Sequence, residues 1–286
     1  MPESVSRPSD PEPALGAAPI EIIRGDFPRG AFRAVIFDFD GTLSLLRRNW
    51  QDVMIPMMVE ILAETGTGES SERLGEVVED FVMRLNGKQT IYQMIQLRDE
   101  VTRRGGAPLD PLDYKRIYHD RLYEQVGVRV EAVRSGRVPA ETMTVPGTRR
   151  LLESLTERGL ALYLASGTDL AYVRDEADLL GVGPFFGERI FGALDDYRKF
   201  SKQMIIQRMI AEMDLDGSSI LGIGDGFVEI EEVKRVGGAA LGVASNEETR
   251  TGVNAWKRAR LIRAGADLII GDYRAHDALL RTLGLE

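Results

Sequence analysis

From residue 139 onward, segments typical of strands alternate with segments typical of helices. The strand-like segments are short and apolar throughout, whereas the helix-like segments carry apolar residues three and four positions apart. LALYLAS, SSILGIGD, AALGVAS and DLIIGD are strand-like, and at least one helical pattern separates each from the next. Strands that alternate with helices form parallel sheets covered on both faces. This part of the chain therefore predicts an α/β fold with a Rossmann-like parallel sheet.

A further strand of the same kind lies nearer the N-terminus. The segment FRAVIF, residues 32–37, is apolar and rich in β-branched and aromatic residues, which predicts a buried strand. Residues 46–140 instead hold four amphipathic helical segments with Gly-rich breaks and no strand pattern. We therefore predict a catalytic core from residues 31–45 and 141–286 with a helical cap inserted at 46–140. Residues 1–30 hold six of the twelve prolines and predict a mostly disordered tail.

Composition excludes several classes of function. Of the 286 residues, 43% are hydrophobic and 28% charged, as in ordinary globular proteins. The net charge of −9 argues against a nucleic-acid partner, and no apolar run is long enough to predict a membrane span. The absence of cysteine excludes disulfides, thiolate metal sites and cysteine nucleophiles. The first ten residues lack the pattern of a secretory signal, so a cytoplasmic enzyme is expected.

Polar residues gather where the predicted strands end. Asp38 and Asp40 follow FRAVIF, Ser166 and Gly167 follow LALYLA, and Asp225 follows SILGIG. Ligands of open parallel sheets bind beyond the carboxyl ends of the strands, so these residues are expected around one site. Two carboxylates two residues apart are costly unless a positive group or a proton lies between them. This argues for a functional site at that edge of the sheet.

Two more residues complete the expected site. Lys202 begins the helix that precedes SILGIG, and Glu229 lies one helical turn after Asp225. Phosphoryl transfer needs a nucleophile, a proton donor, an ammonium group and hydrogen-bond donors for the phosphoryl oxygens. Acidic oxygen ligands favour Mg²⁺. The combination predicts Mg²⁺-dependent phosphoryl transfer.

The motifs DFDGTL, ASGTD, SK and GDGFVE occur in this order, and together they resemble the haloacid dehalogenase superfamily, chiefly its phosphatases, over residues 31–286. The helical insertion resembles the C1 cap of phosphoglycolate phosphatases and β-phosphoglucomutases. The resemblance implies a Mg²⁺-dependent phosphomonoester hydrolase that forms an aspartyl-phosphate. It also implies a small phosphorylated substrate, such as a sugar phosphate or a phosphoglycolate-like compound.

The resemblance assigns roles to the residues of the first two motifs. Asp38 matches the nucleophile, which also binds the metal. Asp40 matches the general acid, which protonates the leaving oxygen and later activates water, and its backbone carbonyl reaches the metal. Thr42, Ser166 and Gly167 match the positions that bind phosphate.

In the later motifs, Lys202 matches the lysine that links phosphate and nucleophile electrostatically. Lys199 competes for this role, but 26 residues separate it from Asp225, whereas 23 separate Lys202, which is closer to the family spacing. Asp225 matches an acidic metal ligand. Glu229 is expected to be a metal ligand too, directly or through water, although the family more often has Asp there.

Arg47 and Arg48 follow the first motif, where the chain leaves the core for the cap. They are interpreted either as ordinary linker residues or as groups that bind the substrate. Both are retained as candidate substrate-binding residues.

Two alternatives to a phosphatase remain open. A phosphomutase of the β-phosphoglucomutase type would use the same residues but pass the phosphoryl group to a second hydroxyl. A non-catalytic binding scaffold is disfavoured because unused clusters of buried charge are costly. A dehalogenase is disfavoured because Asp40 would have no proton to donate. The sequence predicts neither the substrate nor the oligomeric state.

Overall fold

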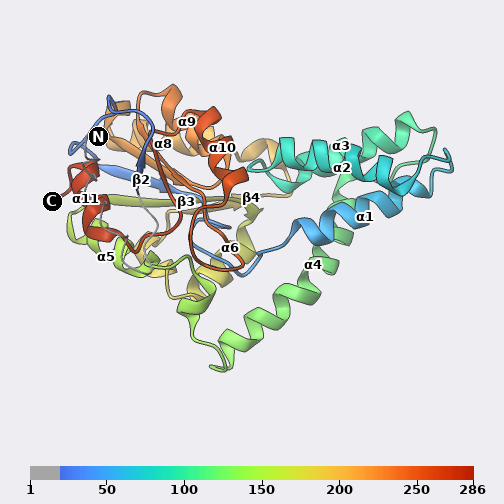
Figure 1. Ribbon diagram of the computed structural model, residues 1–286, viewed down its shortest axis with the longest axis horizontal. Coiled ribbons are helices and arrows are strands. Elements are labelled where there is room, and N and C mark those ends of the chain that lie inside the picture. The colour runs from blue at the N-terminus through green and yellow to red at the C-terminus, as the bar shows by residue number, and fades with distance from the viewer. Residues whose placement is uncertain (1–19) are drawn as a thin grey trace, which may run out of the picture.

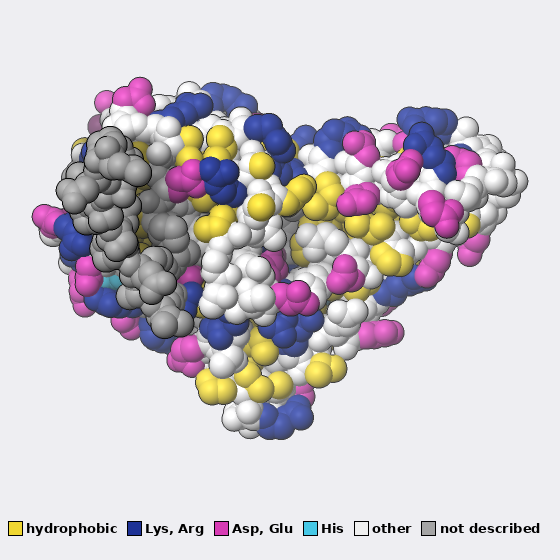
Figure 2. Space-filling model, in the orientation of Figure 1, with side chains coloured by type: hydrophobic (Ala, Val, Ile, Leu, Met, Phe, Trp, Pro, Cys, Tyr) yellow, Lys and Arg dark blue, Asp and Glu magenta, His cyan; other side chains and the backbone are white. Residues whose placement is uncertain are grey.

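The computed structural model describes residues 20–286, and it has two lobes (Figure 1). One lobe is a sheet covered by helices, and the other consists of helices α1 to α4. The first 19 residues of the predicted tail lie outside the described residues. Within residues 20–286, no helix is long and apolar enough to span a membrane. The space-filling view shows the lobes in contact below a notch in the outline (Figure 2).

A seven-stranded sheet forms the core, with strand order β1-β7-β6-β5-β2-β3-β4. Neighbouring strands are parallel except β1, which pairs antiparallel with β7. The predicted parallel sheet is thus confirmed, with one short antiparallel strand at its edge. The strands are β1 (Glu21–Ile22), β2 (Ala34–Phe37), β3 (Ala161–Asp169), β4 (Ile190–Ala193), β5 (Ile220–Gly224), β6 (Ala239–Val243) and β7 (Leu268–Ile270).

Both faces of the sheet are buried beneath helices. All four residues of the central strand β2 are buried, and alternate residues point to opposite faces. Val35 and Phe37 share an apolar cluster with residues of α5 (Thr148–Glu157), α6 (Leu170–Leu179), α7 (Gly183–Phe186) and α11 (His276–Leu283). Ala34 and Ile36 share another with α8 (Lys202–Met213) and α9 (Phe227–Arg235), beside which α10 (Ala255–Ala264) packs. Burial on both faces explains why the strands are apolar throughout.

The helical insertion lies between β2 and β3, as the sequence predicts. Its helices are α1 (Gln51–Ala63), α2 (Ser71–Leu85), α3 (Thr90–Arg103) and α4 (Pro111–Arg134). Side-chain caps fix two of the helix starts: Ser70 accepts a hydrogen bond from the Arg73 amide, and Asp110 accepts one from the Leu112 amide. The predicted domain limits, 46–140 for the cap, stay a prediction.

Two linkers join the lobes and run side by side. The amide of Leu45 donates to the carbonyl of Met143 at 2.8 Å, and the amide of Val145 donates to that of Leu43 at 3.0 Å. A short helical turn, η1 (Ala140–Met143), precedes the return into the core. The start of the first linker directly follows the DFDGT motif, so any movement of the helical lobe occurs next to the loop that carries Asp38 and Asp40.

Some elements were missing from the sequence-based description. β4 and α7 lie in the stretch GVGPFFGERIFGAL, whose glycines obscure both a strand and a helix pattern. β3 continues beyond Ser166 to Asp169, with an irregular pairing to β4 after Ala165. Two short turns, η2 (Tyr197–Lys199) and η3 (Gly217–Ser219), complete the core.

Candidate active site

The strand order brings three predicted motifs together. β2 lies between β3 and β5, so Asp38, Ser166 and Asp225 emerge at the same edge of the sheet. They line a cavity of about 90 Å³ whose opposite wall comes from the helical lobe. From the core, the lining residues are Asp38, Asp40, Gly41, Ser166, Gly167, Thr168, Lys202, Asp225 and Glu247. From the first linker and the helical lobe, they are Arg47, Trp50, Met54, Asn86, Gly87, Lys88, Thr90, Gln93, Tyr118 and Leu122.

Asp38 lies in contact with a buried lysine at the floor of the cavity. The ammonium of Lys202 is 2.8 Å from Asp38 Oδ1 and 2.7 Å from Glu229 Oε2. Burial raises the pKa of Asp38 well above its ordinary value, and the Lys202 charge opposes that rise. Burial also disfavours the ammonium, but Asp38 and Glu229 together raise the pKa of Lys202. Lys202 is therefore charged, and its ammonium favours the carboxylate form of Asp38 against the effect of burial.

Of the two candidate lysines, the structure brings only Lys202 to Asp38. Lys202 is the first residue of α8, and the Ser201 side chain caps that helix by accepting from the Met204 amide at 3.1 Å. Lys199 lies in the preceding turn, is largely exposed and pairs with Asp196 at 3.6 Å. The geometry thus favours Lys202 for the predicted role.

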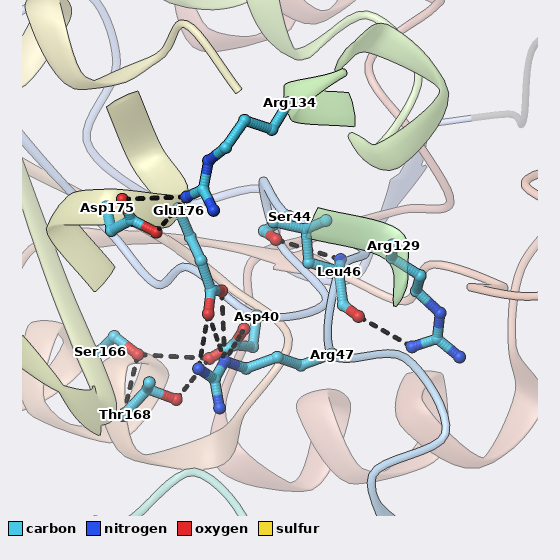
Figure 3. Close-up of polar contacts among 10 residues, drawn as sticks. All are labelled: Asp40, Ser44, Leu46, Arg47, Arg129, Arg134, Ser166, Thr168, Asp175 and Glu176. Carbon is cyan, nitrogen blue, oxygen red and sulfur yellow. Dashed lines mark hydrogen bonds and ion pairs between the residues drawn. The ribbon is translucent and has the colours of Figure 1, made fainter. Parts of the chain in front are cut away.

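Asp40 is held from one side by two hydroxyl groups (Figure 3). Its Oδ2 accepts a hydrogen bond from Thr168 Oγ1 at 2.8 Å and a longer one from Ser166 Oγ at 3.4 Å. The Ser166 hydroxyl also accepts from the Thr168 amide at 3.0 Å. Ser166, which was predicted to bind phosphate, thus contacts Asp40, the predicted general acid. The contact between Thr168 and Asp40 was not predicted from the sequence.

The other oxygen of Asp40 is buried and has no hydrogen-bond partner among residues 20–286. Its nearest basic group is Arg47, whose Nε lies 4.0 Å away. Burial raises the pKa of Asp40, which the Arg47 charge and the Thr168 hydrogen bond only partly offset. A raised pKa favours the protonated form that a general acid needs.

Arg47 and Arg48 have different surroundings. Arg47 is buried, lines the cavity and forms an ion pair with Glu176 of α6 at 2.5 Å (Figure 3). The Tyr172 ring lies 5.5 Å from the Arg47 guanidinium carbon. Arg48 is not among the described lining residues, and its carbonyl accepts from Arg129 at 3.0 Å. The structure therefore places Arg47, and not Arg48, where a substrate could reach it.

Thr42 points away from the cavity. Its hydroxyl accepts a hydrogen bond from the Asp225 amide at 3.0 Å, and its carbonyl accepts from the Tyr273 hydroxyl at 3.0 Å. The side chain is fully buried. In this structure Thr42 therefore joins the loop after β2 to the loop after β5, and it does not line the cavity as a phosphate-binding group would.

Gly167 lies at a close contact between the two lobes. A Cβ atom at this position would lie 2.7 Å from the Lys88 carbonyl oxygen. Beside it, Gly87 packs against Gly226, and a Cβ atom on Gly226 would lie 3.1 Å from Gly87 Cα. The turn between α2 and α3 thus rests on the loops after β3 and β5. The backbone at Gly167 faces both the cavity and the helical lobe.

The family model of haloacid dehalogenase-like hydrolases matches residues 32–237, well over half of the chain. The chain belongs to this family. No curated protein matches it in sequence. The resemblance inferred from the DFDGTL, ASGTD and GDGFVE motifs is therefore confirmed.

Solved structures with the same fold are distant in sequence. A predicted phosphoglycolate phosphatase from Haemophilus somnus 129PT is 18% identical with a TM-score of 0.54, covering 88% of this chain and 99% of its own. A β-phosphoglucomutase from Clostridium difficile is 13% identical with a TM-score of 0.57, covering 88% and 97%. A family hydrolase from Deinococcus radiodurans R1 with bound phosphate and sodium is 15% identical with a TM-score of 0.50, covering 88% and 96%. These likenesses show a shared fold.

The acidic residues of the site fit a divalent cation. Carboxylate oxygens of Asp38, Asp225 and Glu229 lie within 4.8 Å of one another, and Mg²⁺ is bound by such oxygen ligands. Glu229 is fully buried and also accepts from the Gly226 amide at 2.7 Å through Oε1. Asp38 and Asp225 face the cavity, whereas Glu229 lies beneath it. Asp38 and Asp225 are therefore the two carboxylates of this cluster that a cation in the cavity could reach.

The sequence analysis missed four polar residues of the core that line the cavity or contact its predicted site residues. Glu247 follows β6, so the same strand-end reasoning that found Asp225 could have found it. Thr168 lies two residues beyond Ser166 within a predicted motif. Glu176 and Lys257 lie inside helices, and helical position alone gives no signal of contact with a distant loop.

Proposed function

We propose that this protein is a Mg²⁺-dependent phosphomonoester hydrolase that acts through a phosphorylated Asp38. The observation that carries the proposal is the pairing of Asp38 with Lys202 at 2.8 Å, opposite a partly buried Asp40 held by Ser166 and Thr168. Burial raises the pKa of both carboxyl groups, but only Asp38 has an ammonium group in direct contact, whereas the nearest cation to Asp40 is Arg47 at 4.0 Å. Such a difference in surroundings suits a nucleophile and a general acid.

The reaction would proceed in two steps. Asp38 attacks the phosphorus atom while Asp40 gives its proton to the leaving alkoxide, which departs as an alcohol. Asp40, now a carboxylate, removes a proton from a water molecule that attacks the phosphorus and releases phosphate from Asp38. Lys202 neutralises charge on the transferring group throughout. Mg²⁺, held by Asp38, Asp225 and the Asp40 carbonyl, would supply further positive charge to the phosphoryl oxygens.

The cavity favours a small substrate. Its volume of about 90 Å³ is below the roughly 300–1,000 Å³ of common ligand pockets. On the helical wall, side chains with neutral hydrogen-bonding groups, Tyr118 among them, outnumber charged ones. Arg47 is already neutralised by Glu176, which disfavours a second anionic group such as the carboxylate of phosphoglycolate. These features support a small sugar or polyol phosphate.

The same observations weigh against the mutase alternative. A mutase of the β-phosphoglucomutase type must bind a sugar carrying two phosphates during its cycle, and thus needs a second cationic site. Of the described lining residues, the basic side chains besides Lys202 are Arg47 and Lys88. Because Glu176 pairs with Arg47, Lys88 alone remains for a second phosphate.

A panel of small phosphate esters tests the proposal. Phosphate release is measured with Mg²⁺, with EDTA, and after Mg²⁺ is restored, for the wild type and Asp38→Asn. The proposal expects turnover of sugar or polyol monophosphates that EDTA abolishes, Mg²⁺ restores and the variant lacks. Activity that survives EDTA contradicts the metal assignment. Isomerised sugar phosphate without phosphate release would instead establish the mutase.

A further inference from the structure

One lysine of the basic run WKRARLIRAG departs from the pattern of its neighbours. This run forms α10, and Trp256 in its first turn is 41% exposed. Lys257, the next residue, is only 6% exposed. A buried ammonium group is costly unless acidic or polar groups contact it, so the partners of Lys257 indicate its role.

The ammonium of Lys257 lies among residues of the site. It is 2.7 Å from Asp225 Oδ2, 2.5 Å from Glu247 Oε1 and 3.2 Å from Ser245 Oγ. An ammonium has three donors, so all of them have partners here. Ser245 in turn donates to the Gly41 carbonyl at 2.6 Å. Lys257 thus connects Asp225 with the loop that carries Asp38 and Asp40.

These groups are closely packed. Gly41 has a positive φ of 74°, and a Cβ atom there would lie 2.3 Å from Asp225 Oδ2 and 2.9 Å from Glu247 Oε1. Two carboxylates therefore lie against the same stretch of backbone and would repel each other without a cation between them. Burial opposes the charged form of Lys257, but Asp225 and Glu247 raise its pKa, so the ammonium persists.

We propose that Lys257 is a positioning residue for the metal site: it holds one oxygen of Asp225 and so fixes the orientation in which Asp225 binds the cation. The inference rests on the proposed Mg²⁺-dependent function. Residues that hydrogen-bond to metal ligands set their orientation, and their loss costs about 10–100-fold in metal affinity. Lys257 itself touches neither the metal nor the substrate.

Two other roles for Lys257 predict different results. If the ammonium only competes electrostatically with the metal, its removal tightens metal binding. If it only stabilises the fold, its removal lowers the melting temperature and leaves metal affinity unchanged. Lys234 provides a matched control, because it pairs with Asp267 at 2.9 Å and does not line the cavity.

Mn²⁺ binding without substrate, measured by electron paramagnetic resonance, distinguishes these roles. The variants are Lys257→Ala, Lys257→Met, which keeps an apolar stem, and Lys234→Ala. We expect both Lys257 variants to bind Mn²⁺ about 10–100-fold more weakly, and Lys234→Ala to bind as the wild type does. Propylammonium, which replaces the deleted atoms, should restore affinity in Lys257→Ala but not in Lys257→Met.

Activity assays add a second readout. At saturating Mg²⁺ the kcat of Lys257→Met should stay within about threefold of wild type, while the Mg²⁺ concentration for half-activity rises with the Mn²⁺ dissociation constant. Unchanged or tighter Mn²⁺ binding in a folded Lys257 variant overturns the inference, as does a wild type that binds no Mn²⁺. A wild type that binds Mn²⁺ but hydrolyses no ester refutes the proposed function, and the affinity ratio still decides the role of Lys257.

Discussion

The two walls of the cavity are built differently. On the core wall, nearly every polar group is held by another: Asp38 by Lys202, Asp40 by Thr168, and Asp225 by Lys257. The helical wall carries mostly neutral side chains, among them Trp50, Met54, Asn86, Thr90, Gln93, Tyr118 and Leu122. Charge-assisted hydrogen bonds are stronger than neutral ones and hold the side chains of the core wall in a fixed geometry. The neutral side chains of the helical wall form weaker contacts, which can be replaced with a smaller loss of binding energy. From this comparison we propose that the core determines the chemistry and that the helical lobe selects the substrate.

Asp38→Asn should have the largest effect. The amide has nearly the shape of the carboxylate but is a poor nucleophile, so kcat should fall on the order of 10⁴-fold or more for every substrate. Phosphate release and a thermal melt together check this. A folded variant that keeps its activity would remove Asp38 from the proposed role.

Asp225→Ala should come next, because it removes an accessible metal ligand. The Mg²⁺ concentration for half-activity should rise by more than about 100-fold, since even indirect supports of a ligand cost about 10–100-fold. Ca²⁺, which prefers more ligands than an octahedral site offers, should inhibit the wild type. Mg²⁺ titrations of both proteins test this, and an unchanged half-activity concentration would contradict it.

Arg47→Ala tests whether Arg47 supports the reaction, like the residues of the core wall, or selects the substrate, like those of the helical wall. Arg47 contacts Glu176 and approaches Asp40, so we expect kcat/KM to fall about tenfold to a hundredfold, for a natural ester and for p-nitrophenyl phosphate alike. Arg48→Ala is the matched control and should change both within about twofold. A loss confined to the natural ester would assign Arg47 to substrate selection instead.

Gly167→Ala tests the contact between the walls. The added methyl group would meet the Lys88 carbonyl at 2.7 Å, so the helical lobe must shift away from the core. We expect roughly a tenfold loss of kcat/KM on all substrates, from an overpacking cost of about 1–3 kcal/mol. The backbone amides of Gly87 and Lys88 should exchange their hydrogens faster in the variant than in the wild type. Unchanged exchange together with normal activity would contradict a close contact between Gly167 and the helical lobe.

Tyr118→Phe should have the smallest effect, and a selective one. Loss of one neutral hydrogen bond costs about 0.5–1.5 kcal/mol, so KM for the natural sugar phosphate should rise about two- to tenfold with kcat kept. Hydrolysis of p-nitrophenyl phosphate should be unchanged. Equal losses on both substrates would place Tyr118 with the reaction rather than with selection.

The sequence predicted the residues of the core wall better than those of the helical wall, because the two sets of residues are positioned by different kinds of structure. Asp38, Ser166 and Asp225 directly follow apolar strands, and the carboxyl ends of parallel strands meet at one edge, so their proximity could be predicted. Tyr118 and Gln93 lie on separate helices whose packing angles no local pattern encodes. The helices themselves were predictable, because their apolar spacing is local.

Partners of charged residues were the hardest to predict. Lys257 and Glu176 resemble surface residues of amphipathic helices in the sequence, yet both are buried against site residues 32 and 129 positions away. Thr42 shows the converse: its motif predicts phosphate contact, whereas the structure directs its hydroxyl to the Asp225 amide. Burial and partner choice both arise from tertiary packing.

The most direct test of the account is to trap the phosphorylated enzyme. Wild-type protein is mixed with excess substrate and Mg²⁺, quenched within milliseconds and reduced with borohydride, which converts an aspartyl-phosphate to homoserine. The account predicts homoserine at position 38, detected by peptide mass spectrometry, and none when EDTA replaces Mg²⁺. Pre-steady-state phosphate release with Asp38 left unmodified at every quench time would contradict it.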